Sequence, residues 1–193
     1  MQTINFVTSN PLKLKDVHPI LGNHTIFKLV HHALELPELQ ASLDEVAINK
    51  CITAAAIIED SILVEDTSLA FNSLNGLPGP YIKTFIQQIG LEGLIRILSD
   101  YEDKTAIATS TFAYTKGPNQ PVKLFTGTMH GKIISPSKAT PHETSWEAIF
   151  EPDGWHISYA MMEKDTKNKV SHRYKALMLL LDYLTQDKSN DTP

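Results

Sequence analysis

The sequence predicts an α/β fold in one unit, because β-rich runs alternate with helical patterns along most of its 193 residues. Residues 4–8 form an apolar strand, and Asn10 and Pro11 after it are typical of a helix start. Ser42-Leu43-Asp44-Glu45 is a capping box, which opens a second helix. Residues 61–64 form an apolar, buried strand that ends at two carboxylates.

The other elements follow in order. The helix from Pro11 is expected to end near Leu21, where Gly22 stops it, and residues 25–30 read as a second strand. The helix from the capping box should run to about Glu59. A Gly/Pro-rich loop follows the 61–64 strand, and a helix is expected from about residue 82 to residue 98.

Residues 105–114 and 122–129 are β-rich and flank the turn 116–121, which predicts a hairpin. Residues 131–160 are expected to be irregular, because prolines interrupt them. A last helix is expected from about residue 170, and its core-facing residues are spaced three and four apart. They are Val170, Tyr174, Leu177, Leu181 and Leu184. We therefore expect one domain over residues 1–186 and a polar C-terminal tail over 187–193.

Composition limits the classes of function. The formal net charge is −5, so we expect no general nucleic-acid-binding surface. No apolar run has membrane-spanning length and the N-terminus does not resemble a signal peptide, so a cytoplasmic protein without membrane contact is expected. The single cysteine, Cys51, excludes an intramolecular disulfide and fits a buried structural thiol in the second helix.

Acidic residues point to a hard metal ion with a phosphate ligand. Glu65 and Asp66 follow the buried strand, and Glu38 lies in a loop-like stretch; carboxylates of this kind bind Mg²⁺ together with substrate phosphates. The strand-to-helix junction Thr8-Ser9-Asn10, with Lys13 in the first helical turn, suits a phosphate group. Strand-end acids in solvent and an ordinary capped helix are the alternatives at these positions.

Two further segments carry cations. The loop from Gly76 to Pro80 delivers Lys83 to the helix that follows it, and Ser171-His172-Arg173 opens the last helix. An Arg beside a His can donate hydrogen bonds to a keto oxygen or a phosphate. A surface arginine at a helix start is the alternative.

Together these motifs resemble the inosine triphosphate pyrophosphatase family, the Ham-type pyrophosphatases of deaminated purine nucleoside triphosphates. The matching segments occur in family order from residue 4 to about residue 184. They include Phe6 through Lys13, Leu36-Pro37-Glu38, Lys50, Leu63 through Thr67, Gly76 through Lys83, Phe150 through Gly154, Lys167-Asn168 and Ser171-His172-Arg173. The resemblance implies an elongated two-lobed fold with a long mixed central sheet and flanking helices, a nucleotide cleft between the lobes, and a homodimer.

The resemblance also implies roles for residues. Glu38 and Asp66, with Glu65 as a further candidate, would hold Mg²⁺ or its substitute Mn²⁺. Asp66 and Lys13 are the expected catalytic residues, and Asp66 would serve as metal ligand, general base or both. Lys13, Lys50, Lys83 and Lys167 would offset the charge of the triphosphate. His172 and Arg173 would donate to the 6-keto oxygen of a deaminated base. The full set of expected substrate-binding residues is Thr8, Ser9, Asn10, Lys13, Lys50, Asp66, Thr67, Lys83, Thr144, Ser145, Trp146, Glu147, Lys167, His172 and Arg173.

One segment departs from the family pattern. Where the family has Phe-Gly-Trp-Asp, this chain has Thr144-Ser145-Trp146-Glu147. Thr144 replaces an aromatic ring expected to stack on the base, which predicts looser base binding. The same fold with another base preference, as in Maf-like pyrophosphatases, and a nucleotide-binding regulatory module with weak turnover are the alternative functions.

Overall fold

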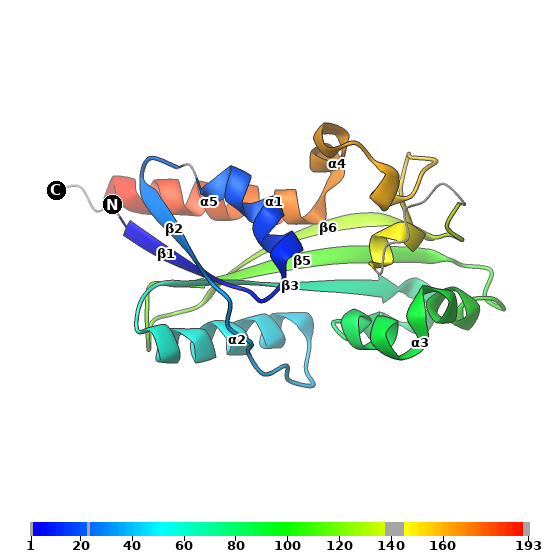
Figure 1. Ribbon diagram of the computed structural model, residues 1–193, viewed down its shortest axis with the longest axis horizontal. Helices are drawn as coiled ribbons and strands as arrows, with labels where there is room; N and C mark the ends of the chain where they lie inside the picture. The colour runs from blue at the N-terminus through cyan, green and yellow to red at the C-terminus, as the bar shows by residue number, and fades with distance from the viewer. Residues whose placement is uncertain (1, 23, 138–144, 191–193) are drawn as a thin grey trace. The chain divides into compact units, whose positions relative to one another are not determined.

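The computed structural model describes residues 2–22, 24–137 and 145–190. Within these ranges seven strands form one sheet (Figure 1). Their order is β2 (Phe27–His32), β1 (Gln2–Val7), β3 (Ile62–Phe71), β5 (Thr105–Thr115), β6 (Lys123–Ile133) and β7 (Phe150–Pro152), and β4 (Pro78–Gly79) pairs with β3. Strand β1 pairs in parallel with both β2 and β3, whereas the β3–β4 and β6–β7 pairs are antiparallel. The sheet is therefore mixed, which confirms the predicted α/β class.

The chain divides into two compact units. Unit 1 contains Met1–Asp66, Ser110–Thr126 and Lys175–Pro193, and unit 2 contains Thr67–Thr109 and Gly127–Tyr174. Strands β3 (Ile62–Phe71), β5 (Thr105–Thr115) and β6 (Lys123–Ile133) contribute residues to both units. Each unit has a buried hydrophobic core of its own.

Unit 1 starts with β1 (Gln2–Val7), α1 (Pro11–Leu21) and β2 (Phe27–His32). The side chain of Asn10 accepts a hydrogen bond from the backbone N–H of Leu12, which caps α1 as the sequence predicts. Strand β2 starts two residues later than predicted, because its register against β1 runs from the Gln2–Phe27 pair to the Val7–His32 pair.

Helix α2 (Leu43–Ile58) begins at the predicted capping box. Ser42 accepts from the N–H of Glu45, and the Glu45 carboxylate accepts from the N–H of Ser42. The helix ends at Glu59, where the backbone turns left-handed with φ of 58°. Helices α1 and α5 (His172–Asn190) cover one face of the strands of unit 1, and α2 covers the opposite face (Figure 1).

Burial on both faces gives unit 1 two core clusters. Leu63 and Phe112 pack with α1 and α5, whereas Ile62, Val64 and Ala113 pack with α2. Adjacent strand residues therefore alternate between the clusters, as the two-residue period of a strand requires.

The predicted end of the third strand was wrong. Strand β3 continues to Phe71, so Glu65 and Asp66 lie inside it rather than at its C-terminal end. The extension is stable because Leu69 and Phe71 are buried in the core of unit 2 and because Leu69 and Ala70 pair with β4 (Pro78–Gly79).

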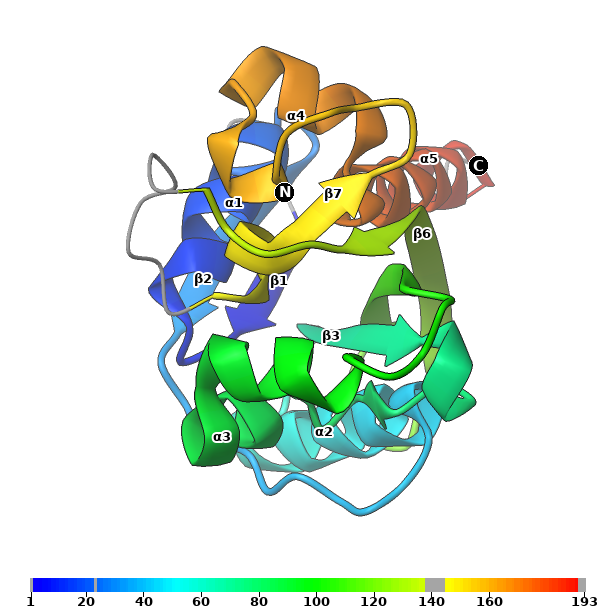
Figure 2. The same cartoon turned by 90° about the vertical axis from the view of Figure 1, so that its right-hand side faces the viewer.

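In unit 2, α3 (Ile82–Ile97) follows the Gly/Pro-rich loop as predicted, with a break at Gly90, whose φ is 68°. The predicted irregular stretch contains short ordered elements: η2 (Trp146–Ile149), β7 (Phe150–Pro152) and η3 (Tyr159–Met161). Strand β7 pairs with the end of β6 (Figure 2), and a Cβ on Gly131 would come within 2.3 Å of the Glu151 carbonyl oxygen. Glycine is required at this close approach.

The predicted last helix is α5, and a short helix that the sequence did not predict, α4, precedes it. Helix α4 (Lys164–Val170) ends at Ser171, whose backbone leaves the helical region with ψ of 125°. The Ser171 hydroxyl then accepts from the N–H of Tyr174 and caps α5, which separates the two helices. Helix α5 buries Ala176, Leu177, Leu180 and Leu184, and it continues to Asn190, beyond the expected domain end.

The described part of the chain contains no helix with both the length and the apolarity needed to cross a membrane.

The one cysteine offers a test of the core of unit 1. Cys51 is fully buried in α2, and burial raises the pKa of its thiol to about 12. At pH 8 we expect the folded protein to leave a thiol reagent such as 5,5′-dithiobis(2-nitrobenzoate) unreacted, because the protonated, buried sulfur is a poor nucleophile. Unfolding in urea should expose one reactive thiol per chain. Complete labelling of the folded protein within minutes would contradict the burial of Cys51.

Candidate functional site

The ammonium group of Lys50 joins two carboxylates of unit 1. Its Nζ lies 3.0 Å from Oδ1 of Asp66 and 3.2 Å from Oε1 of Glu38. Helix α2 supplies Lys50, strand β3 supplies Asp66, and the segment between β2 and α2 supplies Glu38. Two carboxylates that are distant in sequence therefore converge on a single positive charge.

Burial sets the electrostatics of this pair. Asp66 is only 8% exposed, and burial raises the pKa of its carboxyl group, although Lys13 and Lys50 oppose this shift. Burial alone would lower the pKa of Lys50, but the attraction of Asp66 and Glu38 outweighs it and raises that pKa. Lys50 therefore stays charged, while Asp66 is a stronger base than an aspartate in water.

Glu65 has different partners from Asp66. Its carboxylate accepts a hydrogen bond of 2.7 Å from the Ser110 hydroxyl, and Lys13 Nζ lies 3.3 Å from its Oε2. Because neighbouring residues of a strand point to opposite faces, Glu65 is directed toward α1 and Asp66 toward α2. The structure thus groups Glu38 with Asp66 and places Glu65 in a separate contact set.

The predicted phosphate junction lies beside this charge network. Thr8 accepts a hydrogen bond from the backbone N–H of Asn10, and Ser9 and Asn10 are exposed at the N-terminus of α1. Lys13, in the first turns of α1, donates a 2.7 Å hydrogen bond to the backbone oxygen of Glu65. The N-terminal end of the helix dipole and the lysine give this end of α1 a positive potential.

The Glu38/Asp66 pair fits the way proteins bind Mg²⁺. Over residues 2–22, 24–137 and 145–190, no group of three or more His, Cys, Asp or Glu side chains is arranged to hold a metal ion. Mg²⁺ needs no such group, because it commonly uses one or two carboxylates and completes its shell with water and substrate phosphates. Both carboxylates already approach a single cationic nitrogen, so the donor set and its charge suit a divalent cation.

Unit 2 carries the remaining predicted residues. Thr67 follows Asp66 in β3, and Lys83 is exposed in the first turn of α3. Trp146 and Glu147 lie in η2, and the hydroxyl of Ser145 accepts from the N–H of Glu147. Thr144 lies outside the described residues, so the predicted effect of losing the aromatic ring there stays a prediction.

Aromatic rings surround Trp146. Its ring is 8% exposed, stacks on Tyr159 with an interplanar angle of 4°, and lies 5.5 Å from the ring of His172 between centroids. His172 has no exposed surface. Trp146 and His172 are therefore part of a packed cluster. Of the two residues His172 and Arg173 at the start of α5, Arg173 is the partly exposed one.

Lys167 belongs to the same cluster. Its Nζ is 2.5 Å from Oε2 of Glu147 and 4.2 Å from the ring centroid of Tyr159. The longer acid at position 147 thus has a defined role in the structure, because it pairs with Lys167. The Lys167 ammonium contacts Glu147 and Tyr159, and its expected role at the triphosphate stays a prediction.

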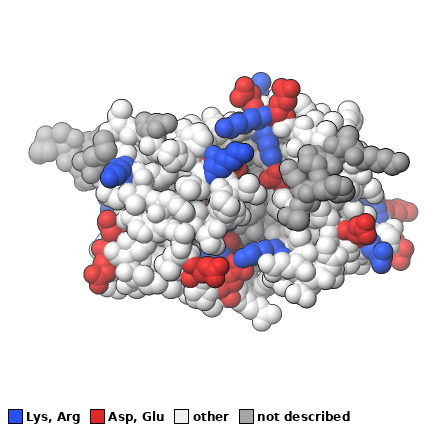
Figure 3. Space-filling model, in the orientation of Figure 1, with Lys and Arg blue, Asp and Glu red and all other residues white. Residues whose placement is uncertain are grey.

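Charges of both signs intermingle on the face that Figure 3 shows, and among the described residues no broad field of lysine and arginine covers it.

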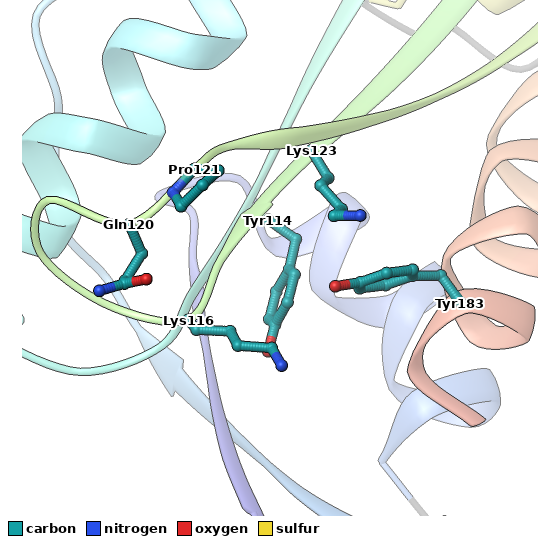
Figure 4. A pocket seen from close by; sticks show the side chains of 6 residues that line it. All are labelled: Tyr114, Lys116, Gln120, Pro121, Lys123 and Tyr183. Atoms are coloured by element: carbon teal, nitrogen blue, oxygen red, sulfur yellow. The ribbon is translucent and has the colours of Figure 1, made fainter. Parts of the chain in front are cut away.

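A cavity of about 220 Å³ lies elsewhere in unit 1, between the turn that joins β5 to β6 and helix α5 (Figure 4). Its lining includes Tyr114, Lys123 and Tyr183, and Lys123 Nζ lies 4.5 Å from the Tyr183 ring centroid. None of the predicted site residues lines this cavity.

Comparison with known families agrees with these features. The sequence profile of the Ham1 family matches residues 4–183, nearly the whole chain. The chain belongs to the Ham1 family. Its relatives include proteins named inosine triphosphate pyrophosphatase from Schizosaccharomyces pombe and Batrachochytrium dendrobatidis. The first is 43% identical and the second 47% identical. Each alignment covers 98% of this chain, and it covers 98% and 97% of the two relatives, respectively.

Solved structures give the same fold for this Ham1-family chain. A HAM1 protein from Coxiella burnetii superposes with a TM-score of 0.86 over 96% of this chain and 100% of that one, at 23% identity. A nucleoside-triphosphatase, dITP/XTP pyrophosphatase, from Mycobacterium abscessus has a TM-score of 0.73 and 26% identity, covering 93% of this chain and 98% of that one.

Sequence reasoning missed two residues that contact the predicted site. The Ser110 hydroxyl donates a hydrogen bond to Glu65 across neighbouring strands, and Tyr159 contacts three of the expected substrate-binding residues. Ser110 carries no local signal, since its role depends on the pairing of β5 with β3. Tyr159 lies in a segment that its composition identifies only as irregular.

The charge network predicts the effect of removing its cation. Lys50→Met leaves Asp66 and Glu38 facing each other without the ammonium group, so we expect the free energy of unfolding to fall by about 1–3 kcal/mol. Urea titration at pH 7 in the presence of a chelator measures this loss. Lys15→Met, which removes an exposed lysine of α1, serves as a control and should change stability by less than about 0.5 kcal/mol. Equal stability of the two variants would show that Lys50 does not compensate the buried charge.

Proposed function

We propose that this protein hydrolyses deaminated purine nucleoside triphosphates, ITP, dITP and XTP, to the monophosphate and pyrophosphate, and so removes them from the nucleotide pool. One observation carries the proposal: Glu38 and Asp66 converge on one cation beside the lysine-bearing N-terminus of α1. Membership of the Ham1 family, with relatives named inosine triphosphate pyrophosphatase, supports the substrate class. The proposal includes a cytoplasmic homodimer.

The phosphate groups are assigned to unit 1. Lys13 and Lys50 carry positive charge next to Asp66, and the positive end of the α1 dipole also favours a phosphate group. Lys83, exposed on α3, is a further cation for the triphosphate. A polyphosphate that binds Lys50 would draw the Lys50 ammonium away from Glu38 and Asp66, and the two carboxylates would then be available to a metal ion.

Glu38 and Asp66 are assigned as the ligands of Mg²⁺, for which Mn²⁺ is a substitute. When bound, the metal ion polarises a phosphoryl oxygen and stabilises the charge that develops on it. Asp66 is also assigned as the general base for the attacking water, an assignment supported by its burial beside Lys50 and by the raised pKa of its carboxyl group. Water attack at the α-phosphorus forms a new P–O bond there and releases pyrophosphate.

The base is assigned to the aromatic cluster of unit 2. Arg173 donates to the 6-keto oxygen of hypoxanthine or xanthine, and the buried His172 orients it from the preceding position. Adenine presents an amino group at that position, so two donors would face each other and its binding would be penalised.

The product of hydrolysis tests the function. Purified protein with Mg²⁺ should release pyrophosphate and a monophosphate from ITP, dITP and XTP, with much lower kcat/KM for ATP and GTP, and chelation of Mg²⁺ should stop the reaction. An enzymatic pyrophosphate assay without added phosphatase distinguishes this product from orthophosphate. Orthophosphate as the first product would contradict the proposal. Preferred turnover of other bases would favour a Maf-like specificity, and binding without turnover would favour a regulatory module.

The acid at the centre of the site gives a second test. Asp66→Asn keeps the size of the side chain but removes its charge and basicity, so kcat for ITP should fall on the order of 10²-fold or more. Circular dichroism should show an unchanged fold. Asp103→Asn, at an exposed acid that caps the start of β5, is the matched control and should keep full activity. Near-normal kcat of Asp66→Asn at saturating Mg²⁺ would exclude Asp66 from the reaction.

A further inference from the structure

The ring of Tyr159 contacts three of the expected substrate-binding residues. It stacks on Trp146 at 6.1 Å between centroids, lies 6.1 Å from the ring of His172, and faces the Lys167 ammonium at 4.2 Å. Tyr159 itself is 3% exposed. We propose that Tyr159 is a positioning residue that fixes Lys167 and the His172–Arg173 pair for recognition of the base; this inference rests on the proposed function.

Lys167 is held by two contacts that differ in kind. The Glu147 carboxylate supplies a short ion pair, and the face of Tyr159 supplies a cation–π contact. A flexible lysine held only by a carboxylate can swing around that group, whereas a second contact with a rigid ring fixes its direction. Loss of the ring would therefore leave the charge of Lys167 in place but free its position.

His172 is fixed by the same ring. The rings of Trp146 and Tyr159 lie parallel, and the His172 ring is tilted by 58° to both. Because His172 begins α5 and precedes Arg173, its packing sets the direction in which the first residues of that helix point. Removal of Tyr159 would loosen the orientation of Arg173 without removing any donor to the base.

Tyr159 differs from an ordinary core residue in the side chains that its ring contacts. Phe150 also packs on Trp146, with ring centroids 5.6 Å apart and an interplanar angle of 87°, and it is fully buried. The ring contacts of Phe150 in the described structure do not include Lys167 or His172. Phe150 and Tyr159 therefore both pack on Trp146, but within the described residues only Tyr159 of the two also contacts Lys167 and His172.

The experiment compares Tyr159→Leu, Tyr159→Phe and Phe150→Leu. For Tyr159→Leu we expect KM for ITP to rise about tenfold, kcat to change less than about threefold, and the ITP-to-ATP ratio of kcat/KM to fall about tenfold. Affinity for inosine monophosphate, measured by calorimetry, should fall by a similar factor. Tyr159→Phe keeps the ring and should match the wild type within about twofold. Phe150→Leu should lose stability but keep the ITP-to-ATP ratio.

Each outcome has a separate meaning. Equal loss of the ITP-to-ATP ratio in Tyr159→Leu and Phe150→Leu, or an unchanged ratio in Tyr159→Leu, would overturn the positioning role. Loss of the ratio in Tyr159→Phe would assign the effect to the hydroxyl and overturn the argument from the ring. If Tyr159→Leu fails to fold, Tyr159→Met provides the same test with a side chain that fills more of the space. Failure of the wild type to release pyrophosphate from ITP would reject the proposed function instead.

Discussion

Burial of β3 on both faces is the constraint on which the site depends. A strand with cores on both sides must alternate its side chains between them, so Leu63 packs toward α1 and α5 while Ile62 and Val64 pack toward α2. The same alternation continues into Glu65 and Asp66. Two adjacent acids therefore face different helices and acquire different partners, and only Asp66 meets Lys50 and Glu38.

Charge compensation explains why acids are tolerated at these buried positions. A buried carboxylate is costly unless an opposite charge or hydrogen bonds accompany it. Glu65 meets this requirement with Ser110 and Lys13, and Asp66 meets it with Lys50. The compensation of Asp66 is incomplete, because its pKa remains above the ordinary value. Stability alone would favour an amide or an apolar residue at this position, so the buried acid is itself a sign of chemistry.

The sequence predicts the elements whose signals are local. The capping box at Ser42, the Asn10–Pro11 helix start and the hairpin turn of residues 116–121 depend on neighbouring residues, and the structure confirms them. The length of β3 depends on its pairing with β4 and on the core of unit 2, so sequence reasoning ended this strand too early. The convergence of Glu38 with Asp66 has the same origin: motif order suggests both residues, but only the tertiary fold shows that one lysine joins them.

The departure at residues 144–147 has a physical reading that the motif alone does not offer. The parallel stack of Trp146 on Tyr159 and the 8% exposure of its ring mean that Trp146 cannot serve as a free platform for a base without leaving its core contacts. The extra methylene of Glu147 extends its carboxylate to Lys167, and Lys167 in turn covers the Tyr159 ring. Glu147 therefore belongs to a coupled set of side chains, in which Glu147, Lys167 and Tyr159 hold one another in position. A change in any one of Glu147, Lys167 and Tyr159 would therefore alter the direction of the same ammonium group.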